Sequence, residues 1–322
     1  MTSVTEPDLD AEYRQIREEC GLIDRSGRAW LEVSGPDAAE YLQSQVTNET
    51  EELAAGSGVY AALLDRKGHL QADMRILRLA EDSFLIDAEK SAGPALFKHL
   101  SMYKIGRKVD VTETGRSLFS LVGPAAFEVT GRAPGSENDF TRATIAGAEC
   151  LVVATWLGLD VIAAPEDGAA VLAQLEEDRA IPVSETALEI LRVERGRPRF
   201  GADMNESNMP AEAGIVDRAI SFTKGCYIGQ EPVARLHYKG RPNRHLRGLR
   251  PVGQVTAGDA VRLGDRELGQ IGTVAISPAS GRIAMAILRK EAEPGSVVEI
   301  ETTGGPIEAE VVELPFIESL EL

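Results

Sequence analysis

Residues 220–235 read ISFTKGCYIGQEPVAR, and they hold the densest group of reactive side chains in the chain. Cys226 lies two residues after Lys224 and between Gly225 and Gly229, which leave the backbone open around it. Lone cysteines are usually small buried hydrophobic residues. A nearby ammonium group instead favours the thiolate and raises its reactivity at neutral pH. The pattern therefore predicts that Cys226 is a reactive thiol.

A single thiolate limits the chemistry that Cys226 can perform. Iron–sulfur clusters usually take four protein ligands, so this cysteine could hold one only with ligands from a partner chain or a second small molecule. Nucleophilic catalysis would need a base, and His237 lies 11 residues further on. The sequence does not bring these two side chains together, so both roles stay open.

A run of positive charge surrounds the same segment. Residues 222–250 contain seven Lys and Arg against the single acid Glu231, whereas the whole chain has a formal net charge of −17. A cationic segment on an acidic protein attracts anions to one place. We therefore expect either a solvated linker between domains or a site for a multiply charged anion, lined by the arginines from Arg235 to Arg250.

A second group of charges occupies residues 191–201, which read LRVERGRPRFG. Ser184 has the position of a helix N-cap, and Gly196 has that of the glycine that ends a helix. Glu194 then falls in the last turn, where the helix dipole disfavours a negative charge. A pair with Arg197 would offset this effect. A carboxylate there is also a good acceptor for the amino and ring N–H groups of a pterin or purine.

Alternating apolar and polar residues predict a β-hairpin over residues 59–79, with its turn at residues 66–68 and a third strand over residues 83–88. Asp73 lies inside the second strand. An acid is unfavourable there unless its side chain faces solvent or a cleft. Both alternatives stay open at this point.

The pattern of predicted secondary structure changes near the last quarter of the chain. Up to about residue 240, two rounds of strands and helices predict a duplicated α+β module. Beyond residue 241, short β runs punctuated by glycine predict an all-β domain, either a small barrel or a sandwich. We therefore expect two domains, residues 1–240 and residues 241–322.

The composition excludes several classes of protein. The chain is 43% hydrophobic and 26% charged, as in soluble globular proteins, and no apolar run approaches the roughly 20 residues of a membrane helix. Cys20, Cys150 and Cys226 are too few and too far apart for a disulfide framework, and the first two are expected to be buried. We predict a cytoplasmic protein with no intrinsic metal, no membrane partner and little direct binding of nucleic acid.

Together these segments resemble the folate-binding proteins related to the glycine-cleavage T protein, and among them the YgfZ branch. The signature of that branch is KGCYIGQE, residues 224–231. Residues 41–48, YLQSQVTN, and the turn at residues 65–68 support the resemblance in the same order. Its motif residues in this chain are Lys224, Gly225, Cys226, Tyr227, Gly229, Gln230 and Glu231.

The resemblance implies a fold and a ligand. The fold is α+β, a cloverleaf of two intertwined subdomains plus a C-terminal β-barrel, and its central hole binds tetrahydrofolate. Glu194 matches the pterin-binding glutamate, and we expect it to share one cavity with Cys226. Arg235, Tyr103 and Gln45 are the other implied folate-binding residues. The cationic run suits the carboxylates of a polyglutamate tail.

The resemblance also supplies hypotheses about function. T proteins transfer an aminomethyl carbon from a lipoyl arm to tetrahydrofolate with an aspartate in a Gly-Gly-x-x-Asp-Asp pattern. Residues 68–73 read GHLQAD, which retains one glycine and one aspartate, Asp73. The YgfZ branch is linked to assembly or repair of iron–sulfur enzymes through the signature cysteine.

Three hypotheses follow. The first is a tetrahydrofolate-binding accessory protein that supports iron–sulfur client or assembly proteins through Cys226. The second is a folate-dependent aminomethyltransferase in which Asp73 is the general acid or base. The third is a factor for tRNA modification, against which the charge of −17 weighs.

Overall fold

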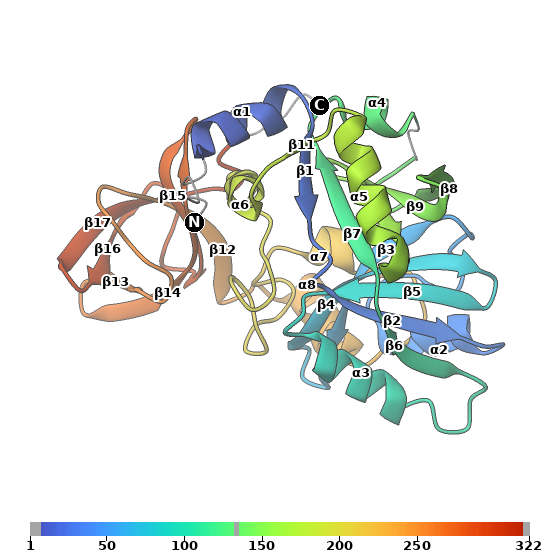
Figure 1. Cartoon of the computed structure of the whole chain (residues 1–322). Helices are drawn as coiled ribbons and strands as arrows, with labels where there is room; N and C mark the ends of the chain where they lie inside the picture. Colours follow the sequence, from blue (N-terminus) through green and yellow to red (C-terminus); the bar gives the residue numbers. More distant parts are fainter. Residues whose placement is uncertain (1–7, 132–134, 318–322) are drawn as a thin grey trace. The chain divides into compact units, whose positions relative to one another are not determined.

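The structure, a computed structural model, describes residues 8–131 and 135–317. Its residues fall into two compact units whose segments alternate along the chain. The first unit takes the residues up to 27 and residues 115–191, and the second takes residues 28–114 and those from 192 to 318 (Figure 1). In the described part, no helix combines the length and the apolar character needed to cross a membrane.

The second unit contains a five-stranded antiparallel sheet of order β3-β4-β5-β2-β6. Its strands are β2 (Ala29–Ser34), β3 (Gly58–Leu64), β4 (Leu70–Ala80), β5 (Ser83–Ala88) and β6 (Asp110–Thr114). The predicted hairpin and third strand are confirmed, because β3, β4 and β5 pair in succession.

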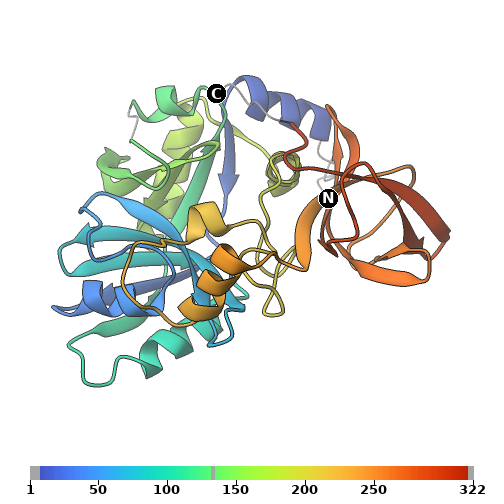
Figure 2. The ribbon, with the colours of Figure 1, turned by 180° about the vertical axis from the view of Figure 1, so that it is seen from behind.

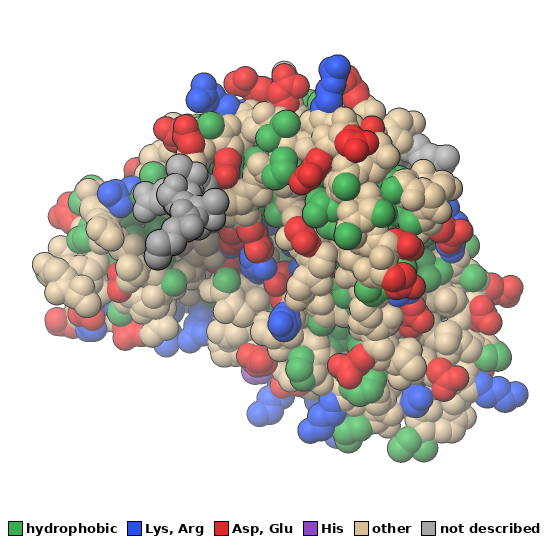
Figure 3. Space-filling view, viewed as in Figure 1, with side chains coloured by type: hydrophobic (Ala, Val, Ile, Leu, Met, Phe, Trp, Pro, Cys, Tyr) green, Lys and Arg blue, Asp and Glu red, His purple; other side chains and the backbone are tan. Residues whose placement is uncertain are grey.

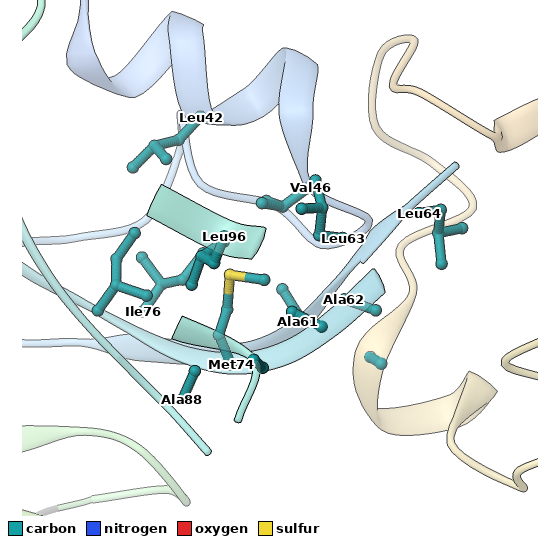
Figure 4. Packing of buried hydrophobic residues seen from close by; sticks show 14 of the residues in the cluster. Leu42, Val46, Ala61, Ala62, Leu63, Leu64, Met74, Ile76, Ala88 and Leu96 are labelled. Carbon is teal, nitrogen blue, oxygen red and sulfur yellow. The ribbon is translucent and has the colours of Figure 1, made fainter. Parts of the chain in front are cut away.

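The side chains of strand β4 alternate between the two faces of this sheet. Its residues at positions 70, 72, 74 and 76 are buried, and the residues between them are half-buried. The buried set packs against helices α2 (Ala38–Gln45) and α3 (Gly93–Met102), and Figure 4 shows Met74 and Ile76 close to Leu96. The opposite face, called here the polar face, carries Tyr60, Gln71, Asp73, Arg75 and Asp87, since directly paired and alternate residues share a face.

Two later helices complete the core of this sheet. Helix α7 (Val216–Ala219) contacts β3, and helix α8 (Gln230–Lys239) contributes the buried Val233 to the same hydrophobic cluster. Figure 2 shows both helices against the sheet. Helix α8 was not predicted, because its first turn holds Pro232 and follows Gly229. Proline is well tolerated in a first helical turn, so these residues start the helix instead of breaking a segment.

The end of the chain forms a closed six-stranded barrel of order β12-β15-β14-β13-β16-β17. A barrel rather than a sandwich therefore follows the α+β part. Its strands are β12 (Arg244–Pro251), β13 (Ala260–Leu263), β14 (Arg266–Ser277), β15 (Gly281–Arg289), β16 (Val297–Thr302) and β17 (Gly305–Val312). Strand β12 was missed because arginines obscure its apolar residues, although Leu249 is fully buried in the barrel core.

The first unit repeats the strand order of the five-stranded sheet. Its sheet has the order β11-β1-β7-β10-β9-β8, so β8-β9-β10-β7 corresponds to β3-β4-β5-β2. Beside β7, however, lies β1, where β6 lies beside β2. The strands are β1 (Gly21–Asp24), β7 (Ser117–Val122), β8 (Phe140–Ile145), β9 (Ala148–Thr155), β10 (Gly158–Ala163) and β11 (Ile181–Pro182).

The α-helices that lie wholly within this unit, among the described residues, are α1 (Leu9–Glu18), α4 (Ala126–Thr130) and α5 (Gly168–Glu177). Cys20 and Cys150 are buried in its apolar cluster, as predicted, and burial raises the pKa of Cys20 to about 12. The α+β class with a C-terminal barrel is thus confirmed.

Candidate functional site

Asp73 lies on the polar face of the sheet, where it is half-buried and held by a phenol. The hydroxyl of Tyr60 donates a hydrogen bond to Asp73 Oδ2 at 2.7 Å. Burial raises the pKa of Asp73 above its ordinary value, and the bond from Tyr60 opposes that effect. A carboxyl group in such surroundings keeps its proton closer to neutral pH, which suits a general acid.

A network of arginines and acids lies on the same face. Asp87, which is 2% exposed, accepts from Arg28 Nε at 2.7 Å and from Arg75 Nε at 2.6 Å. Burial alone would raise the pKa of Asp87, but the charges of Arg75 and Arg28 lower it. Glu89 pairs with two arginines. Its Oε1 lies 2.6 Å from Arg28 Nη1, and its Oε2 lies 3.1 Å from Arg199 Nη2. These ion pairs hold the side chains of the network in fixed positions on the polar face.

This network was not predicted from the sequence, although the sequence carries one signal of it. Asp87 is an acid inside an otherwise apolar strand, and a buried carboxylate needs cationic or hydrogen-bonding partners. Tyr60 carried no such signal, because its bond to Asp73 depends on the register of the hairpin.

Glu194 ends helix α6 (Glu185–Glu194). The caps are as predicted, with Ser184 Oγ accepting from the amide of Ala187 and Gly196 in the left-handed region at φ +63°. Glu194 is fully buried, and its Oε1 accepts a hydrogen bond from Ser277 Oγ of strand β14. Its backbone carbonyl accepts from the amide of Phe316 at 2.8 Å. The carboxylate is therefore held against the barrel.

The Lys224 ammonium group binds backbone carbonyls at the end of helix α2. Its side chain is 8% exposed, and Nζ donates to the backbone carbonyls of Gln43 (2.8 Å), Val46 (2.7 Å) and Asn48 (2.8 Å). An ammonium group has three donors, so these carbonyls take all of them. Burial lowers the pKa of Lys224 to about 8. The first residue of the signature therefore anchors the end of α2, and its expected effect on Cys226 stays a prediction.

Cys226 itself is exposed, together with Gly225. The signature loop packs against the hairpin turn a few residues later. Gly229 has φ +82°, and a Cβ atom added there would lie 2.5 Å from the carbonyl oxygen of Asp65. Only glycine fits this contact without a shift of the backbone. The loop thus presents the Cys226 thiol at the surface from a fixed base.

A cavity of about 640 Å³ lies beside the signature loop. Its lining includes four motif residues, Tyr227, Gly229, Gln230 and Glu231. Tyr103 and His99 from the end of α3 line it as well, and so do Asp65, Arg66 and Gln71 from the hairpin.

Gln45 is linked to this cavity through His99, which was not predicted from the sequence. Gln45 Oε1 lies 3.0 Å from His99 Nε2, and the imidazole stacks on the ring of Tyr103 with 4.5 Å between centroids. Burial lowers the pKa of His99, so the imidazole is neutral at pH 7. Gln45 and Tyr103, predicted separately, thus belong to one arrangement.

Cys226 and Glu194 are not among the residues that line this cavity. Their expected position in one hollow stays a prediction, and so does the contact of Arg235 with folate. Among the described residues, no group of three or more His, Cys, Asp or Glu side chains could hold a metal ion.

The cationic run is not one linker. Arg235 is exposed on α8, whereas Arg247 and Arg250 lie on β12 and interact within the barrel region. Arg247 Nη1 lies 3.5 Å from Glu313 Oε2, and Arg250 Nη1 donates to the carbonyl of Ser280 at 3.1 Å. On the face shown in Figure 3, acidic and basic side chains are interspersed. The run therefore divides between two elements with different partners.

Comparisons with known proteins agree with this architecture. The GCVT N-terminal domain family matches residues 2–224, and the glycine cleavage T-protein C-terminal barrel domain matches residues 244–318. The aminomethyltransferase of Halothermothrix orenii is 28% identical over 325 residues, which cover 95% of this chain and 90% of that protein. The aminomethyltransferase of Symbiobacterium thermophilum is also 28% identical, over 96% of this chain and 89% of that protein.

A solved structure matches the fold over nearly the whole chain. It is the aminomethyltransferase T of the glycine cleavage system from Bartonella henselae, with a TM-score of 0.86 and 24% identity. The match covers 96% of this chain and 90% of that one. Both domain matches and the full-length relatives lead to the same conclusion: the chain belongs to the glycine cleavage T-protein family.

Proposed function

We propose that this protein binds tetrahydrofolate, with the Glu194 carboxylate as acceptor for the amino and ring N–H groups of the pterin. The observation that supports it is a fully buried carboxylate fixed at a helix end by Ser277. A carboxylate accepts a ring N–H and an adjacent amino group together, which is the pattern that the edge of a pterin presents. The exposed Arg235 is the proposed partner of the folate carboxylates.

The resemblance assigns Tyr103 and Gln45 to the folate site as well. Tyr103 lines the cavity beside the signature loop, and Gln45 is joined to that lining only through His99, whereas the lining does not include Glu194. We therefore base the folate proposal on Glu194 and Arg235.

Calorimetric titration with tetrahydrofolate tests the proposal. We expect Glu194→Gln to weaken binding roughly 10- to 100-fold, because the amide replaces a charged acceptor with a neutral group that presents a donor. Glu176→Gln changes an exposed acid on α5 and serves as the matched control. Equal affinity in the two variants, or no binding by the unmodified protein, would show the proposal to be wrong.

The first candidate role for the folate is the accessory one, in support of iron–sulfur client enzymes. The exposed Cys226 in the signature KGCYIGQE favours this role, because a surface thiol can meet a partner protein. We expect Cys226→Ala to keep its folate affinity and melting temperature while client activity falls to the level of cells lacking the protein. Full client activity in that variant would exclude the role.

Folate-dependent aminomethyl transfer is the second candidate, and the comparisons support it more directly than the first. Relatives named aminomethyltransferase match over nearly the full chain, and Asp73 has the raised pKa of a general acid. If the protein transfers an aminomethyl group to tetrahydrofolate, we expect Asp73→Asn to reduce turnover about 100-fold or more while folate binding persists. Absence of turnover in the unmodified protein would exclude this candidate.

A further inference from the structure

Asn48, the last residue of the motif YLQSQVTN, connects strand β3 to helix α7. Its side-chain amide donates to the backbone carbonyl of Tyr60 at 2.9 Å and to that of Arg218 at 3.0 Å. A carboxamide has two N–H donors, so both are used in this connection. Asn48 therefore fixes the backbone of Tyr60 against the helix that carries Arg218.

Thr47 makes a parallel connection one residue earlier. Its hydroxyl donates to the carbonyl of Ala219 at 2.6 Å and accepts from the amide of Ala62 at 2.8 Å. Thr47 is fully buried, so these bonds are shielded from water. The end of the motif thus holds β3 and α7 together beside Tyr60.

The side chain of Tyr60 is held as firmly as its backbone. The guanidinium carbon of Arg218 lies 5.0 Å from the centre of the Tyr60 ring, in a cation–π contact. Burial and the carboxylate of Asp73 raise the pKa of Tyr60 well above its ordinary value, although Arg218 and Arg197 oppose this effect. The phenol therefore keeps its proton at neutral pH and remains the donor in the bond to Asp73 Oδ2.

This bond distinguishes the two carboxyl oxygens of Asp73. Within the part of the chain that the structure describes, no other side chain donates a hydrogen bond to Asp73. A carboxyl oxygen that accepts a hydrogen bond is the carbonyl oxygen of the neutral group, so the proton of neutral Asp73 is favoured on Oδ1. Oδ1 is then the atom through which Asp73 can exchange a proton with a ligand.

Two charged groups near Asp73 are themselves paired. Burial has the largest effect on the pKa of Asp73 and raises it, and the bond from Tyr60 lowers it. Arg28 also lowers this pKa, whereas Glu89 raises it. Because Arg28 Nη1 and Glu89 Oε1 lie 2.6 Å apart, their opposite effects stay fixed when Tyr60 is replaced.

We propose that Tyr60 is a positioning residue for Asp73, that it keeps the exchangeable proton on Oδ1, and that Asn48 holds Tyr60 in place. When Asp73 gives this proton to a substrate atom, the Oδ1–H bond breaks and the carboxylate keeps its bond from Tyr60. A phenol stabilises a carboxylate more strongly than a neutral carboxyl group, so it assists the release of the proton. The inference rests on the proposed aminomethyl transfer for its consequence in turnover.

A nuclear magnetic resonance titration of the full chain, with ¹³C-labelled aspartate, measures the pKa of Asp73. The Asp73 signal is identified by its absence from Asp73→Asn. We expect Tyr60→Phe to raise this pKa by about 1–2 pH units, because the carboxylate loses its donor. Tyr238→Phe is the matched control and should leave the pKa unchanged, since Tyr238 is 67% exposed.

Asn48→Ala tests the second part of the proposal. We expect it to raise the pKa of Asp73 in the unmodified protein but not in Tyr60→Phe, because Asn48 acts only through the phenol. Asn243→Ala changes an exposed asparagine and is the matched control.

Two results would overturn the inference. One is an unchanged pKa of Asp73 in Tyr60→Phe at the melting temperature of the unmodified protein. The other is an effect of Asn48→Ala that is absent from the unmodified protein or equally large in Tyr60→Phe.

Turnover separates this inference from the proposed aminomethyl transfer. In a protein that transfers the group, the part of the pH–rate profile that belongs to Asp73 should move by the same amount in Tyr60→Phe. The expected pKa shifts in a protein without turnover would support the positioning of Asp73 by Tyr60 and exclude aminomethyl transfer alone.

Discussion

Replacing Lys224 with methionine lowers the free energy of unfolding by about 3–5 kcal/mol, because three carbonyl groups at the end of α2 lose their donor together. Methionine fills a similar volume but donates no hydrogen bond. The carbonyls of Gln43, Val46 and Asn48 would then be left beside an apolar side chain. Urea denaturation followed by circular dichroism measures the change.

Lys239→Met is the matched control for this experiment. Lys239 is exposed in the last turn of α8, so its loss should change the free energy of unfolding by less than about 1 kcal/mol. If Lys224→Met had an equally small effect, the three bonds would not stabilise the fold. The signature lysine would then need another role, such as the activation of Cys226 that the sequence analysis predicted.

Replacing Asp87 with asparagine also lowers the free energy of unfolding by about 3–5 kcal/mol, since it leaves two half-buried guanidinium groups without the buried counter-ion that they share. Asparagine keeps the size of the side chain, and therefore the loss isolates the charge. Asp110→Asn is the matched control on β6, where the carboxylate is 86% exposed. A loss no larger than that of the control would contradict the assigned role of Asp87.

The difference in stability between the unmodified protein and Asp87→Asn should depend on pH, and the sign of that dependence follows from the pKa of Asp87. Arg75 and Arg28 lower the pKa of folded Asp87 below that of the unfolded chain, about 3.9, so the unfolded chain takes up the proton first as pH falls. The stabilisation is complete above that unfolded value and is lost as pH falls through the folded pKa. The stability difference between the unmodified protein and Asp87→Asn should therefore shrink below about pH 4. A constant difference from pH 7 to pH 2 would contradict this account.

Local periodicity predicted the parts of the fold that depend on neighbouring residues. The hairpin of β3 and β4 alternates apolar and polar residues, and the glycine-punctuated runs near the end of the chain form the barrel. Helix α8 was missed because Pro232 and the preceding Gly229 interrupt the pattern at its start, and strand β12 was missed because arginines separate its apolar residues. The core that α8 completes is set by distant strands, which no local window contains.

The candidate site was predicted less completely, for a physical reason. The residue types at Glu194, Asp73 and Cys226 indicated chemistry, but their partners come from register and from backbone atoms. Tyr60 reaches Asp73 because β3 and β4 pair with a shift at Leu63 and Leu64. Lys224 binds carbonyl groups, which every residue has and no sequence pattern marks. The contacts of His99 with Gln45 and Tyr103 likewise depend on tertiary structure, because Gln45 lies on a different helix.

The interleaved order of the two units has a consequence during synthesis. Strands β2 to β6 leave the ribosome early, but the bond from Lys224 to Val46 joins residues 178 positions apart. The whole segment 115–191 of the first unit is made in between. Nascent chains that stop before helix α8 therefore carry an unfinished apolar surface, and truncated chains ending near residue 200 should aggregate.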